Sequence, residues 1–183
     1  MFTAADNHLL TRTGPGSAMG DYFRRYWQPV ALSAELPEPD GTPLRVTLLG
    51  EDLLAFRDTQ GRIGLVEPKC AHRGADLFFG RNEECGLRCV YHGWKYDIEG
   101  KCVEMPNVPP GSAYHGKIAI RAYPTREFGD MVWAYLGPRE HMPAELPQLE
   151  AALVAPAQRA GSCSTSSSAV APPIIGGHVH RRR

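Results

Sequence analysis

The sequence predicts an all-β protein, an antiparallel sandwich or small barrel, and three observations support this class. Short segments alternate apolar and polar residues with a period of two, as half-buried strands do. Turns rich in Gly and Asp separate these segments at short intervals, which favours antiparallel neighbours. The chain has 183 residues, of which 43% are hydrophobic, so it can bury one core and one main domain is expected.

Residues 1–43 are expected to form an N-terminal segment in front of this domain. Residues 1–17 are polar and rich in turn formers, and the run T-G-P-G-S at residues 13–17 predicts a loop. Residues Met19–Trp27 bring apolar side chains close to helical spacing, which predicts a short helix that ends before Pro29. The aromatic side chains of this helix are expected to pack against the domain.

Residues 44–150 carry the alternating pattern and are predicted to be the β domain. The predicted strands are Leu44–Leu48, Leu53–Arg57, Ile63–Val66, Lys117–Arg121 and Met131–Leu136, with a hairpin of Lys95–Ile98 and Lys101–Val103. The turn between the first two strands is expected at residues 50–52. Residues 151–183 contain no Asp, Glu or Lys and show neither period, so they are expected to form a disordered tail.

Charge and composition restrict the partners and the compartment. Twenty basic and twenty acidic residues cancel, so there is no excess charge for nucleic acid or anionic lipid. The chain starts without the basic and apolar regions of a secretion signal, and no apolar run reaches the roughly 18 residues of a membrane span. A cytoplasmic protein without nucleic-acid or membrane partners is therefore expected. Cys85 and Cys102 are expected to be reduced thiols, because disulfides are rare in that compartment.

Two Cys–His pairs lie between the predicted strand Ile63–Val66 and the predicted hairpin. Cys70-x-His72 and Cys89-x-x-His92 stand on either side of the sixteen residues 73–88. Two thiolates and two imidazoles suit a tetrahedral zinc ion. They equally suit a [2Fe–2S] cluster in which two histidines replace two cysteines on one iron.

Local features favour the two-iron cluster over zinc. Zinc-binding loops commonly pair cysteine with cysteine and histidine with histidine, whereas each loop here carries one of each. Mixed pairs allow both loops to reach across two irons, with the cysteines on one iron and the histidines on the other. Gly74 and Gly93 follow the ligands closely and let backbone N–H groups approach bridging sulfides. Zinc remains the alternative.

The run C-A-H-R-G-A, followed after a loop by C-V-Y-H-G-W-K-Y-D, resembles the Rieske signature. From about Asn7 to Leu149 the chain resembles the N-terminal Rieske domain of ring-hydroxylating oxygenases, most closely the phthalate 4,5-dioxygenase large-subunit group. One departure is Ala71, where the family usually has proline. The resemblance implies a β domain whose ligand loops form a small cluster-binding subdomain at its tip.

The resemblance also implies the cofactor, the ligands and the partners. Cys70 and Cys89 would hold one iron and His72 and His92 the other iron of a single [2Fe–2S] cluster, which transfers one electron at a time. The electron donor would be an NADH-dependent reductase or a ferredoxin, and the trimeric assembly common in the family implies a homo-oligomer.

Members of the resembled family carry a second, catalytic domain after the Rieske domain. That domain holds mononuclear Fe(II) on two histidines and a carboxylate, and such a triad is not expected within this chain. His178 and His180 of the tail are interpreted as a solvated terminus, so no catalytic residue is assigned. We expect a chain truncated or frameshifted near Leu149, which transfers electrons without oxygenating a substrate. The alternative function is a stand-alone Rieske ferredoxin-type carrier.

Acidic residues lie between the two Cys–His pairs. Asp76, Glu83 and Glu84 are interpreted as surface charges of a hairpin, with docking of a reductase as the alternative.

Overall fold

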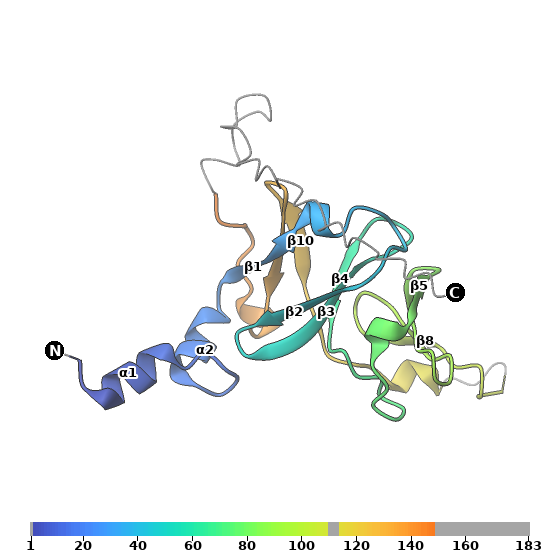
Figure 1. Cartoon of the computed structure of the whole chain (residues 1–183), viewed down its shortest axis with the longest axis horizontal. Helices are drawn as coiled ribbons and strands as arrows, with labels where there is room; N and C mark the ends of the chain where they lie inside the picture. Colours follow the sequence, from blue (N-terminus) through green and yellow to red (C-terminus); the bar gives the residue numbers. More distant parts are fainter. Residues whose placement is uncertain (1, 110–113, 149–183) are drawn as a thin grey trace, which may run out of the picture. The chain divides into compact units, whose positions relative to one another are not determined.

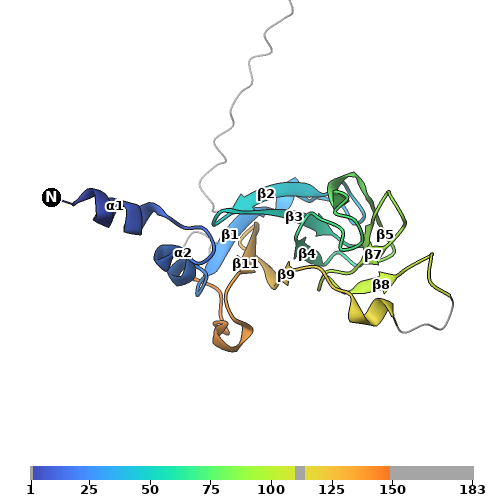
Figure 2. The ribbon, with the colours of Figure 1, turned by 90° about the horizontal axis from the view of Figure 1, so that it is seen from below.

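The computed structural model of the protein describes residues 2–109 and 114–148, and this part of the chain is mostly antiparallel sheet. The first sheet has the strand order β1-β11-β10 (Figure 1). The second has the order β2-β3-β4-β9, and the third has the order β5-β6-β7-β8 (Figure 2). The all-β class is confirmed.

The strands have the following bounds. They are β1 (Trp27–Leu32), β2 (Leu44–Leu48), β3 (Glu51–Arg57), β4 (Ile63–Val66), β5 (Arg81–Glu83), β6 (Gly86–Arg88), β7 (Lys95–Tyr96), β8 (Cys102–Glu104), β9 (Ala122–Tyr123), β10 (Thr125–Phe128) and β11 (Met131–Tyr135). The helices are α1 (Ala4–Thr11) and α2 (Ala18–Phe23), with 3-10 turns η1 (Ser33–Glu35), η2 (Leu77–Phe79), η3 (His115–Lys117) and η4 (Arg139–His141). Among these helices, none is long and apolar enough to cross a membrane.

The hairpin of β2 and β3 is two residues tighter than the sequence predicted. Leu48 pairs with Glu51, so the turn consists of Leu49 and Gly50, both with positive φ (48° and 76°). Two consecutive left-handed residues match the twist of the flanking strands. The expected turn at residues 50–52 is wrong because Glu51 already belongs to the strand.

Strand β3 is buried on both of its faces. Leu54 and Phe56 belong to the core that also contains Cys70 and Cys89 of the two ligand loops, whereas Leu53 and Ala55 belong to a second core. In the neighbouring strand, Gly64 lies under the Phe56 ring, where a Cβ atom would come within 2.5 Å of ring carbon Cε1. A side chain at Gly64 would therefore displace the ring that supports the ligand loops.

The N-terminal segment contains the predicted loop at residues 13–17 and one helix more than predicted. Residues 4–11 form helix α1, which begins at a capping box of Thr3 and Asp6. Helix α2 is shorter than predicted and is followed by β1, which pairs with β11. Trp27 is buried as expected, whereas Tyr22 and Tyr26 are exposed. The boundary between the segment and the domain at residue 44 stays a prediction.

The predicted strand Lys117–Arg121 is wrong. Its first residue ends η3, and the following residues form a single bridge, between Ala119 and Lys101, before β9 begins. The bonds from the Cys102 N–H to the Ile118 carbonyl and from the Ile120 N–H to the Gly100 carbonyl form this bridge, so the segment joins the β7–β8 hairpin through one bridge instead of a continuous ladder. The predicted disordered tail, residues 151–183, lies outside the described residues.

A buried ion-pair group joins the N-terminal segment to the second sheet. Glu51 accepts from Arg24 at 2.8 Å, and its second oxygen accepts from Arg121 and Tyr123, each at 2.7 Å. The side chains of Arg24 and Glu51 are each 9% exposed. Arg24 also donates to the carbonyl oxygens of Thr13 and Leu49, so one guanidinium fastens the segment before α2 and the β2–β3 turn to β3.

Candidate metal centre

The two ligand loops have the same backbone design. We call residues 70–75 the first ligand loop and residues 89–94 the second. In the first, Cys70 N–H donates to the Ala75 carbonyl at 2.9 Å and Gly74 N–H donates to the Cys70 carbonyl at 2.8 Å. In the second, the same two bonds link Cys89 to residue 94 at 2.8 Å and Gly93 to Cys89 at 3.0 Å. Each loop is thus a closed turn that begins at its cysteine.

Glycine makes both turns possible. Gly74 has φ +69° and Gly93 has φ +74°, a left-handed conformation that strains other residues. The glycine after each Cys–His pair therefore closes the turn that presents the pair.

The structure brings the four predicted ligands together as two pairs of like donors. Cys70 and Cys89 are each 3% exposed and lie in the same core. The His72 and His92 rings, both half-buried, lie with their centroids 4.4 Å apart. In the described part of the chain no three His, Cys, Asp or Glu side chains converge as ligands of one metal ion.

The surroundings of His72 favour a neutral imidazole that can bind a metal ion. Its ring stacks on Trp94 with centroids 4.5 Å apart and planes 12° from parallel, and Trp94 Nε1 is fixed by a 2.7 Å bond to Asn107. Desolvation, reinforced by the charges of His92 and Arg73, lowers the pKa of His72. Its Nδ1 atom is buried and has no hydrogen-bond partner among the described residues. A buried, unpartnered imidazole nitrogen is costly unless a ligand occupies it.

Tyr96 lies under the first ligand loop and contacts its cysteine. The fully buried hydroxyl accepts from the Ala71 N–H at 3.1 Å and lies 3.3 Å from Cys70 Sγ. Since the oxygen already accepts from Ala71, its own proton is available to a Cys70 thiolate. Burial, followed by the contact with Cys70, raises the pKa of Tyr96, so the hydroxyl stays protonated and serves as a donor. Burial likewise raises the pKa of Cys70.

Ion pairs hold the residues on either side of the first ligand loop. Asp76 caps η2 and accepts from Arg45 at 3.1 Å and from Lys69 at 3.3 Å, which fastens the chain on either side of the first loop. Hydrogen bonds from Phe78 N–H, Arg45 and Lys69 outweigh the effect of burial and lower the pKa of Asp76. Asp76 thus supports the loop, beyond the surface role expected from sequence.

Glu83 and Glu84 also belong to ion pairs at the second loop. Arg88, the residue before Cys89, pairs with Glu83 and forms two 2.8 Å bonds with the carboxylate of Glu104. Lys95 pairs with Glu84 at 2.9 Å. The bond from Arg88, with help from Lys95, lowers the pKa of Glu104 to about 2.

The described part contains two further cysteines, of which Cys102 lies in the same core as the ligand cysteines. Cys85 and Cys102 are free thiols, as expected. Cys85 lies in the β5–β6 turn, where its N–H donates to Thr59. Cys102 is buried, which raises its thiol pKa to about 11. Cys102 is therefore a protonated thiol near neutral pH.

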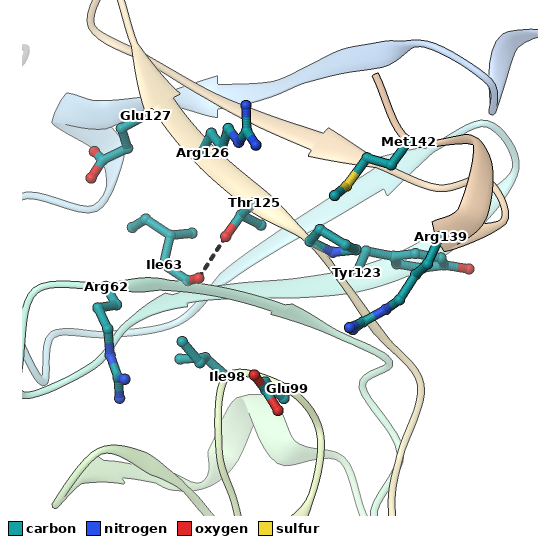
Figure 3. A pocket seen from close by; sticks show the side chains of 11 residues that line it. Arg62, Ile63, Ile98, Glu99, Tyr123, Thr125, Arg126, Glu127, Arg139 and Met142 are labelled. Atoms are coloured by element: carbon teal, nitrogen blue, oxygen red, sulfur yellow. Dashed lines mark hydrogen bonds between the residues drawn. The ribbon is translucent and has the colours of Figure 1, made fainter. Parts of the chain in front are cut away.

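A cavity of about 470 Å³ opens on another part of the domain (Figure 3). Ile63, Ile98 and Met142 give it apolar walls, and Arg62, Arg126 and Arg139 are among its polar lining. Most of these charges already have partners: Arg62 binds Asp58 through two bonds and Arg126 donates to the Ala144 carbonyl.

Sequence reasoning missed the residues that surround the ligands. Tyr96 and Glu104 are far from their partners in sequence, and only the strand register brings them to Cys70 and Arg88. A supporting role of Arg88 could have been predicted from the sequence, because it is a basic residue directly before a ligand cysteine.

An all-β domain whose paired loops unite two cysteines and two histidines has the design of a redox metal-cluster domain. The Rieske [2Fe-2S] domain family matches residues 26–124, more than half of the chain. The chain belongs to this family.

Curated proteins and solved structures of oxygenases are also similar to this chain. The phthalate 4,5-dioxygenase oxygenase subunit of Pseudomonas putida is 50% identical over 147 residues, which are 80% of this chain and 34% of that protein. The chain thus spans about a third of the length of this curated relative. Dicamba monooxygenase bound to dicamba is similar with a TM-score of 0.62 and 27% identity, covering 72% of this chain and 40% of that chain. The oxygenase and ferredoxin complex of carbazole 1,9a-dioxygenase is similar with a TM-score of 0.54 and 32% identity, and the match covers 69% of this chain and 31% of that chain.

The side chains at the loops fit the [2Fe–2S] cluster of the family. The family cluster takes two thiolates on one iron and two neutral imidazoles on the other. Here the thiols are free and adjacent, and the buried Nδ1 of His72 has no other partner among the described residues. The grouping of like donors matches a site that divides four ligands between two metal ions.

Proposed function

We propose that this chain is the electron-accepting Rieske domain of a ring-hydroxylating oxygenase component. Cys70 and Cys89 bind one iron and His72 and His92 bind the other iron of one [2Fe–2S] cluster. The observation that carries this proposal is the pairing of like donors, with the cysteines together in the core and the histidines together nearer the surface.

A bound cluster supplies one-electron transfer. The chain's own residues hold and shield it. Cys70 and Cys89 anchor it in an apolar core that excludes water from the thiolates. Trp94 keeps the His72 ring in place by stacking, and the two histidine rings, being half-buried, lie on the side from which electrons can pass to a partner.

The partners follow from the relatives. The relatives' names describe oxygenase subunits, and one solved relative is a complex of an oxygenase with a ferredoxin. We propose that a ferredoxin or an NADH-dependent reductase reduces this chain in the cytoplasm. The electron then goes to the catalytic iron of an oxygenase acting on an aromatic acid, and a homo-oligomer is the proposed assembly.

The purified protein tests the proposal directly. We expect iron without zinc, visible absorbance, and after reduction with dithionite the electron paramagnetic resonance (EPR) signal of a [2Fe–2S] cluster with mixed ligands. NADH and a class-matched reductase should bleach the same absorbance. Colourless protein that contains stoichiometric zinc would contradict the proposal in favour of a structural zinc module.

Tyr96→Phe is expected to lower the reduction potential while the cluster stays in place. A ligating Cys70 thiolate carries no proton, so at the 3.3 Å contact the Tyr96 hydroxyl would be the donor; it withdraws negative charge from the sulfur, which favours the reduced state. If the bond is worth about 1.4 kcal/mol more in the reduced state, the potential falls by about 60 mV for one electron. A redox titration followed by visible circular dichroism measures the change.

Tyr91→Phe is the matched control, because Tyr91 is exposed and contacts the His92 ring through its own ring. That ring remains in the variant. Equal shifts in the two variants would show that the Cys70 contact does not tune the potential.

A further inference from the structure

Five charged side chains flank the second ligand loop in the sequence: three precede it and two follow it. We call Glu83, Glu84, Arg88, Lys95 and Glu104 the Arg88 cluster. Arg88 pairs with Lys95 across β6 and β7, and Lys95 pairs with Glu104 across β7 and β8, so three of its members occupy adjacent positions on neighbouring strands. The side chains of Arg88 and Lys95 are only 12% and 8% exposed. The register of the third sheet therefore sets the geometry of the cluster.

The Arg88 guanidinium is held from two sides. Nη1 and Nη2 each donate to one oxygen of Glu104 at 2.8 Å, and Nε donates to Glu83. Two carboxylates fix all three nitrogens of the planar fork, which leaves little rotational freedom. The geometry is specific to arginine, because a lysine ammonium offers a single point of contact.

The fixed guanidinium reaches the backbone of the second ligand loop. Nη1 donates to the Gly93 carbonyl at 3.1 Å. Gly93 itself closes the turn by donating its N–H to the Cys89 carbonyl at 3.0 Å. Arg88 thus fixes the carbonyl next to His92, in the turn that also begins with Cys89.

We propose that Arg88 is a positioning residue for the second ligand loop, and that the charge of the Arg88 cluster biases the reduction potential of the iron–sulfur centre. This inference rests on the proposed function of the loops. The cluster contains three carboxylates and two cations, and Glu83 also pairs with the exposed Arg81 at 3.4 Å, so the paired charges balance. Removing the Glu104 charge leaves one uncompensated positive charge, and because reduction adds negative charge nearby, the potential should rise.

Two variants test the two parts. Arg88→Lys keeps the charge and removes the fork, so the absorbance of the loaded protein should disappear about tenfold faster in the presence of a chelator, as expected for losing one bond of about 1.4 kcal/mol. Arg81→Lys is the control, since Arg81 lies opposite Arg88 in β5 but is 70% exposed. Glu104→Gln should raise the potential, with a smaller rise at 1 M salt than at 0.1 M.

Glu99→Gln is the control for charge, because Glu99 forms an exposed ion pair with Lys101 at 2.6 Å. Equal rates of loss in Arg88→Lys and Arg81→Lys would overturn the positioning role. A potential in Glu104→Gln that is unchanged, lower, or shifted equally in Glu99→Gln would overturn the charge bias. In both cases the wild-type protein still shows the [2Fe–2S] signal, whereas wild-type protein without that signal would overturn the proposed function instead.

Discussion

Replacing Cys70 or Cys89 by serine is expected to abolish the [2Fe–2S] signal completely. Both thiols are 3% exposed and lie in the same core at the start of the two ligand loops. Ligand bonds formed only in the folded state contribute directly to its stability. The variants should therefore be colourless and should melt at a lower temperature than the loaded wild type, as measured by absorbance and circular dichroism.

Cys85→Ser is the matched control for this experiment. Cys85 is half-exposed in the β5–β6 turn, and its contact with Thr59 is made by its backbone N–H, which serine keeps. Full absorbance is expected in this variant. Loss of colour in Cys85→Ser together with its retention in Cys70→Ser would show that the ligands have been misassigned.

Glu51→Ala should lower the free energy of unfolding by about 3 kcal/mol at pH 7. Removing one partner of a buried ion pair costs about 3–5 kcal/mol, because the other charge is left buried. The lower end applies here, since Arg24 keeps its bonds to the carbonyls of Thr13 and Leu49. Urea denaturation measures the change. Glu67→Ala is the control, because Glu67 is more exposed and lies 3.6 Å from Arg121.

The loss in Glu51→Ala should also depend on pH. Burial alone would raise the pKa of Glu51, but bonds from Arg24 and Tyr123 and the charges of Arg24 and Arg121 lower it overall. A carboxylate with a lowered pKa stabilises the fold above its unfolded pKa of about 4.3, and this contribution is lost as the pH falls below it. The difference between wild type and variant should therefore narrow below about pH 4. A difference that is constant from pH 7 to pH 3 would contradict the role of the charge.

The sequence predicted those features that depend on residues close to one another in the chain. Strand Leu44–Leu48 is found where its alternation placed it, because one of its faces is more buried than the other. The Cys–His pairs could be recognised because the residues of each pair are close in sequence. The left-handed conformation of Leu49 could not be predicted, because the alternation of apolar and polar residues carries no information on the φ angle of a residue other than glycine.

Strand register and tertiary contacts determine the features that the sequence did not predict. Residues 117–121 alternate like a strand, yet they join the β7–β8 hairpin through a single bridge. The surroundings of the ligands are a matter of register as well. Tyr96 meets Cys70, and Glu104 meets Arg88, only after β6, β7 and β8 have paired.

Strand β3 makes the ligand loops and the rest of the domain one cooperative unit. Leu54 and Phe56 pack in the same core as Cys70 and Cys89, while Leu53 and Ala55 on the opposite face of the strand pack against β11 residues such as Val132. The strand cannot melt on one face and remain folded on the other. Because a ligand that binds only the folded form protects everything that unfolds with its site, cofactor loading should slow amide hydrogen exchange in β11 as well as in the ligand loops.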